Sequence, residues 1–118
     1  MKPTKDPQAN ALGGVISQKH TDKNVASPAV LTQAGQIATF FVTHTDWAKG
    51  AAQELLYHVQ RSKDGIEWAD ALVGWGVTDP GREQRHEFAV DAVDYECFYR
   101  ALVEVKGSVT IKIESVVE

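Results

Sequence analysis

The sequence predicts an all-β domain built as an antiparallel β-sandwich of about seven strands. Three observations carry this prediction. From residue 28 onward, short apolar runs are cut by turn residues about every eight to twelve positions, which is typical of a sandwich. Several runs alternate apolar and polar side chains, as expected for strands with one buried face. Asp64-Gly65 and Asp79-Pro80-Gly81 have the composition of tight turns.

Apolar runs place the strands in order along the chain. Strands are predicted at 29–31, 37–43, 54–61, 66–68, 84–90, 95–105 and 109–113. The apolar run at 72–77 is broken by glycine and is predicted to cross a sheet edge. The second run is β-branched and aromatic, as a buried strand should be. The third run places Leu55, Tyr57 and Val59 on one face. A turn at Gly107 separates the last two runs, which predicts a terminal hairpin.

Residues 1–27 are predicted to form an extended basic arm outside a domain of residues 28–118. They are polar and rich in Gly and Pro, apart from an apolar patch at 11–16. Residues 1–24 carry a charge of +2. Because the net charge of the chain is −4, residues 25–118 carry −6. The arm would therefore suit the acidic body of a neighbouring copy.

Composition narrows the classes of function. A net charge of −4 argues against nucleic-acid binding, which needs clustered Lys and Arg. No apolar run approaches the roughly 20 residues of a membrane helix. The first residues also do not lead into the apolar stretch of a signal peptide. A length of 118 residues fits one domain with its own core.

No catalytic, cofactor or metal site is predicted. The four histidines lack the spacings that bring two ligands together on a helix, and metal sites need three or four ligands. No nucleophile elbow or glycine-rich phosphate loop occurs. Cys97 is the only cysteine, so the chain cannot form an internal disulfide. We therefore expect a protein that is not an enzyme and needs no cofactor.

Two motifs resemble the immunoglobulin superfamily. "DAVDYEC", residues 91–97, resembles the E-to-F corner, in which the tyrosine two residues before a cysteine bonds back to upstream backbone. "YHVQRSKDGIEWADA", residues 57–71, resembles the C-to-C′ hairpin of bacterial and phage immunoglobulin-like modules. The resemblance implies an immunoglobulin-like sandwich without its disulfide. Cys97 would then be a packing residue, because a free cysteine behaves as a small apolar side chain.

Modules of this kind occur in the structural proteins of tailed bacteriophages, as capsid decorations and as appendages of tail proteins. The resemblance thus implies a virion protein that is assembled in the host cytoplasm. The favoured role is a capsid decoration or cement subunit, present as a homo-oligomer or in many copies, that binds the major capsid protein or another virion protein.

Two alternatives remain open. One is a tail or head-to-tail component. The other is a carbohydrate-binding module, since tryptophans in sandwich loops can stack on sugar rings. The residues predicted to bind partners are Lys2, Lys5, Leu12, Val15, Ile16, Lys19, Lys23, Trp47 and Trp75.

Overall fold

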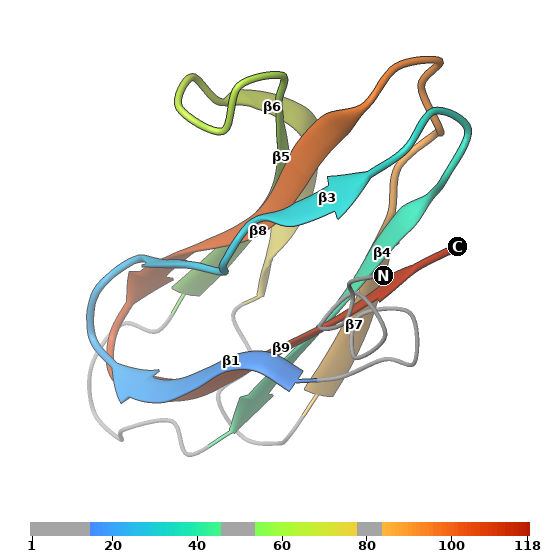
Figure 1. The fold of residues 1–118 in the computed structure, drawn as a ribbon. Coiled ribbons are helices and arrows are strands. Elements are labelled where there is room, and N and C mark those ends of the chain that lie inside the picture. Colours follow the sequence, from blue (N-terminus) through green and yellow to red (C-terminus); the bar gives the residue numbers. More distant parts are fainter. Residues whose placement is uncertain (1–14, 46–53, 78–83) are drawn as a thin grey trace.

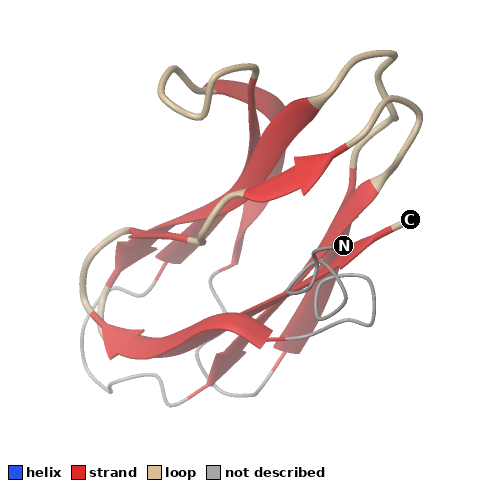
Figure 2. Ribbon diagram, in the orientation of Figure 1, coloured by secondary structure: helices blue, strands red, loops and turns tan. Residues whose placement is uncertain are grey.

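The structure is a computed structural model that describes residues 15–45, 54–77 and 84–118, apart from the side chains of 73–77 and 84. Within these ranges the regular elements are nine β-strands, and Figure 2 shows them joined by loops. The described residues therefore contain no helix that could cross a membrane. The prediction of an all-β chain is confirmed.

The strands form two antiparallel sheets that face each other (Figure 1). Sheet A has the order β1 (Val15–Thr21), β9 (Val109–Val117), β4 (Ala38–Thr45) and β7 (Gln84–Ala89). Sheet B has β8 (Cys97–Lys106) beside β5 (Glu54–Ser62), with β6 (Ala69–Val77) at the edge. Its other edge is formed by β2 (Val25–Ala26) and β3 (Val30–Thr32), which both pair with β8. β2 and β3 thus act as one interrupted strand.

The strand order is that of a jelly roll, not of an immunoglobulin domain. With β2 and β3 counted as one, the two sheets of four strands have the connectivity of paired Greek keys. An immunoglobulin order would place the last strand in the same sheet as the two strands that correspond to β5 and β8. Instead β9 pairs with β1 and β4, so the predicted terminal hairpin is also wrong. The turn at Gly107, with φ of 117°, leads from one sheet to the other.

The predicted strands otherwise lie close to observed ones. The runs at 29–31, 37–43, 54–61, 84–90, 95–105 and 109–113 correspond to β3, β4, β5, β7, β8 and β9. The run at 72–77 lies within β6, but the prediction of a strand at 66–68 is wrong. Ile66 lies in the β5–β6 loop with 79% of its surface exposed, and β6 begins at Ala69.

Part of the predicted arm belongs to the sandwich. β1 pairs with β9, from Val15 opposite Glu114 to Thr21 opposite Val109, and β2 pairs with β8. The Ser27 amide also donates a hydrogen bond of 2.8 Å to the Ala101 carbonyl. The folded domain therefore includes residues 15–27, and only residues 1–14 of the predicted arm lie outside the described residues.

The core fills the space between the two sheets. Its largest fully buried side chains include Phe40, Leu55, Tyr57, Tyr99, Ile111 and Ile113. Cys97 is a free, buried thiol whose Sγ lies 3.6 Å from Thr32 Oγ1. The prediction that Cys97 is a packing residue is confirmed.

Candidate functional site

β1 is the first candidate interaction surface, because it forms an edge of sheet A. It carries three of the predicted partner-binding residues, namely Val15, Ile16 and Lys19. Among the described strands it pairs with β9 alone, and Val15 is 54% exposed. An edge strand presents unpaired backbone N–H and C=O groups, which can pair with a strand from another chain. β1 is therefore a place where a partner could extend sheet A.

Side-chain hydrogen bonds hold the C-terminal half of β1 in place. His20 Nδ1 is bonded to Thr110 Oγ1 and His20 Nε2 to Ser108 Oγ, both at 2.8 Å. Just after β1, Asn24 Oδ1 accepts a 3.0 Å hydrogen bond from the Val105 amide. Ile16, near the start of β1, packs against the core but is only partly buried. The anchoring thus lies away from the end that leads to residues 1–14.

The structure brings together only some of the predicted site residues. Val15, Ile16 and Lys19 share β1, and the exposed Lys23 lies in the turn between β1 and β2. Four of the remaining residues lie outside the described part of the chain: Lys2, Lys5, Leu12 and Trp47. Trp75 lies on β6, but its side chain is outside the described residues.

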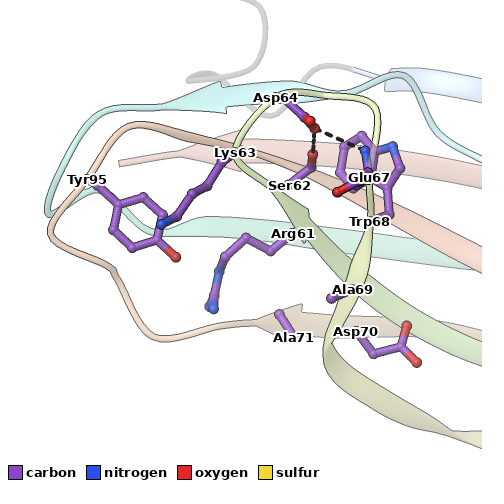
Figure 3. Close-up of a pocket in the computed structure, with 10 residues that line it drawn as sticks. All are labelled: Arg61, Ser62, Lys63, Asp64, Glu67, Trp68, Ala69, Asp70, Ala71 and Tyr95. Atoms are coloured by element: carbon purple, nitrogen blue, oxygen red, sulfur yellow. Dashed lines mark hydrogen bonds between the residues drawn. The ribbon is translucent and has the colours of Figure 1, made fainter.

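A second feature, which the sequence did not predict, is a cavity of about 520 Å³ beside the β5–β6 loop (Figure 3). It is lined by Arg61, Ser62, Lys63, Asp64, Glu67, Trp68, Ala69, Asp70, Ala71 and Tyr95. Most of these residues come from the end of β5, the loop and the start of β6. Tyr95 comes from the segment before β8 and brings a distant part of the sequence to the site.

The β5–β6 loop is organised around one carboxylate. Asp64 Oδ1 accepts hydrogen bonds from the Glu67 amide at 3.0 Å and from the Ile66 amide and Ser62 Oγ, both at 2.8 Å. These bonds, that from the Glu67 amide first, lower the pKa of Asp64 to about 2. Gly65 has φ of 77° and its amide donates to Ser62 Oγ. Gly65 thus has the positive φ that a tight turn at Asp64-Gly65 requires.

Two cations face this cavity. Arg61 Nε donates a 3.1 Å hydrogen bond to the Tyr99 hydroxyl, and the guanidinium carbon lies 5.3 Å from the centre of the Tyr99 ring. Lys63 Nζ lies 4.6 Å from the centre of the Tyr95 ring. Among the described residues, neither cation forms an ion pair with a carboxylate. The positive charges of Arg61 and Lys63 are therefore available to a ligand.

The tyrosine corner predicted for Tyr95 is wrong. The Tyr95 hydroxyl makes no hydrogen bond to any residue in the described ranges. The ring is only partly buried, and Tyr95 lies outside the strands, since β8 begins two residues later, at Cys97. Tyr95 instead forms a wall of the cavity beside Lys63 (Figure 3).

A buried aromatic cluster links the two sheets at another place. The Tyr57 hydroxyl on β5 and His44 Nδ1 on β4 form a 2.9 Å hydrogen bond. The His86 ring on β7 stacks 5.8 Å from the His44 ring and lies 5.3 Å from the Tyr57 ring. Burial raises the pKa of the Tyr57 hydroxyl and lowers the pKa of His86, so both groups are neutral at pH 7. The described residues contain no group of three or more metal-binding side chains.

Acid should weaken the fold through His86. Its pKa is lowered in the folded state, so the unfolded chain binds a proton more readily once the pH falls below the ordinary histidine value of about 6.5. The melting temperature should therefore fall between pH 7.5 and pH 5.5, and this fall should be smaller in His86→Phe. Thermal unfolding of both proteins at the two pH values measures the difference. An equal fall in both would assign the acid sensitivity to other groups.

Comparison with known proteins does not assign the chain to a family. No protein-family model and no curated protein matches it. Among solved structures, the chain is similar to the crystal structure of Yersinia pseudotuberculosis-derived mitogen, with a TM-score of 0.35 and 6% sequence identity. The match covers 81% of this chain and 86% of that chain. A likeness with so low a TM-score carries no functional argument, so the function is inferred from the chain's own geometry.

Proposed function

We propose that this chain is a virion structural protein, in particular a capsid decoration subunit. It binds neighbouring virion proteins through its N-terminal segment and the β1 edge of sheet A. Its partner is the major capsid protein, and many copies act together on one particle. The protein acts by binding and not by catalysis.

The position of β1 is the observation that carries this proposal. β1 is an edge strand, and its first residue, Val15, is more than half exposed. The chain that precedes it, residues 1–14, includes Lys2 and Lys5 and has the opposite charge sign to the body of the domain. A basic segment that directly precedes an open sheet edge in the chain can make both backbone and charge contacts with a neighbouring subunit.

The fold is compatible with this role. Jelly rolls are common among viral capsid domains and lectin domains. Because one fold serves many functions, this agreement is an analogy and adds less than the position of β1 does.

Deleting residues 1–14 should separate attachment from folding. The deletion leaves all nine strands of the described structure, so the melting temperature should change by less than about 4 °C, equivalent to under about 1 kcal/mol. Affinity for the particle should fall at least about tenfold, because multipoint attachment gains from each tether. Co-sedimentation of the intact and shortened chains with capsids assembled without this protein measures both affinities.

Salt provides a control on the same samples. Between about 0.05 and 0.5 M salt, exposed charge pairs are screened, so binding of the intact chain should weaken more than binding of the shortened chain. If the shortened chain binds as tightly as the intact one, residues 1–14 do not attach the protein. If the intact chain is absent from capsids but present in purified tails, the tail or head-to-tail alternative is correct.

A further inference from the structure

The cavity beside the β5–β6 loop is lined by cationic side chains, hydrogen-bond acceptors and aromatic rings, which together suit a ligand site. We propose that it binds an acidic sugar, that is, a monosaccharide unit carrying a carboxylate. This site is separate from β1 and does not depend on the proposed role in the virion. Of the three tryptophans that the sequence offers for binding sugars, Trp47, Trp68 and Trp75, the described lining of this cavity includes Trp68.

One side of the cavity is suited to a carboxylate. Arg61 and Lys63 lie there beside Tyr95 (Figure 3). Arg61 uses Nε for the Tyr99 hydroxyl, and in the described part of the chain its two terminal nitrogens have no hydrogen-bond partner. A guanidinium with free terminal N–H groups can bind a carboxylate through two parallel hydrogen bonds. Lys63 adds a second positive charge.

The other side of the cavity offers acceptors for hydroxyl groups. The Glu67 carboxylate and Asp64 Oδ2 receive no hydrogen bond from any described residue. The Asp70 carboxylate is instead engaged by Gln60 Nε2 at 3.2 Å and lies 3.4 Å from His58 Nδ1. A sugar acid has one carboxylate and several hydroxyl donors, so it matches a cavity with cations at one side and free acceptors at the other. A simple peptide carboxylate offers fewer donors and matches less well.

The walls and the size of the cavity also fit a sugar ring. Tyr95 and Trp68 are half-buried aromatic side chains, and such surfaces suit the apolar face of a sugar. Arg100 holds Trp68 in place, because its guanidinium carbon lies 4.3 Å from the centre of the indole ring. Ala69 and Ala71 are small and leave space between these walls. A volume of about 520 Å³ lies within the range of small-molecule sites.

The test is a titration of the ¹⁵N-labelled full chain with three probes, followed by NMR. Sodium glucuronate carries both the ring and the charge, glucose carries the ring alone, and N-acetyl-alanine carries a peptide carboxylate. We expect glucuronate to shift the signals of Gly65, Tyr95 and Arg61 Nε–H, with a Kd at least about tenfold lower than that of either other probe.

Matched charge variants locate the site. Lys63 is exposed and donates no hydrogen bond to a described residue, so Lys63→Gln should fold normally and weaken glucuronate binding about three- to tenfold. Arg61→Gln should weaken binding more, although it also removes the bond to Tyr99. The control is Arg85→Gln, which removes the same charge from sheet A, where Arg85 lies over Phe41. Arg85→Gln should leave the affinity unchanged.

Three results would overturn the proposal. Glucose binding as tightly as glucuronate would remove the role of Arg61 and Lys63. Tighter binding of N-acetyl-alanine would assign the cavity to a peptide carboxylate. An equal loss in Arg85→Gln and Lys63→Gln would show a general effect of charge and not a site.

Discussion

Phe40→Ala should lower the free energy of unfolding by about 3–5 kcal/mol, the largest loss that we expect from a single substitution in this chain. Phe40 is fully buried on β4, which lies between β9 and β7 in sheet A. Removing its ring leaves a cavity between the two sheets, and a packed core closes such a cavity only in part.

Phe41 provides the matched control, because it is the next residue of the same strand and faces the other way. It is only partly buried, and the Arg85 guanidinium carbon lies 4.2 Å from the centre of its ring. Phe41→Ala should therefore lower the free energy of unfolding by about 1 kcal/mol. This loss combines the burial of a small apolar area with an exposed cation–π contact. Urea unfolding of the two variants measures the difference. Equal losses would contradict the register of β4 in sheet A.

Alternation in the sequence predicts most, but not all, of the side chains that form the core. Seven side chains are predicted to share it, and Tyr95 is the exception, because it is only partly buried against the core. The other six are buried together: Val59, Phe88, Val90, Cys97, Tyr99 and Val103. The alternation predicts these residues because successive side chains of a strand point to opposite faces of the sheet. The apolar side chains of each run therefore mark the face that is buried. This prediction requires no knowledge of which strands are neighbours.

The neighbours of each strand could not be predicted in the same way. β9 buries Val109, Ile111 and Ile113 whether it lies beside β8 or beside β4. The turn at Gly107 is short enough for a hairpin, and only the pairing of β9 with β1 and β4 excludes one. The resemblance to an immunoglobulin domain therefore gave the right layers and the wrong connections.

β1 and the cavity were missed for different reasons. Apart from Val15 and Ile16 at its start, β1 is polar. It is held by backbone pairing and by His20, so it has no apolar alternation to detect. The cavity depends on Tyr95 lying against a loop some thirty residues earlier in the sequence. The sequence shows that Arg61 and Lys63 lie beside a turn. It does not show that Tyr95 lies next to them and closes one side of the cavity.

Tyr57→Phe should lower the free energy of unfolding by about 1–3 kcal/mol, because it takes away the hydrogen-bond partner of a buried nitrogen. The Tyr57 hydroxyl bonds to His44 Nδ1, and His44 is fully buried between the sheets. Water cannot easily replace the lost hydroxyl at this place, so the desolvation of Nδ1 is no longer compensated.

Tyr99→Phe is the control that separates this cost from that of losing any tyrosine hydroxyl. Tyr57 and Tyr99 are both almost completely buried, with 1% and 0% of their surface exposed, and phenylalanine keeps the packing of either ring. The Tyr99 hydroxyl bonds to Arg61 Nε, which is only half-buried and can turn to water instead. Tyr99→Phe should therefore cost at most about 1 kcal/mol. Equal losses in chemical unfolding would mean that the Tyr57–His44 bond between the sheets contributes no more than a bond at the rim of the sandwich.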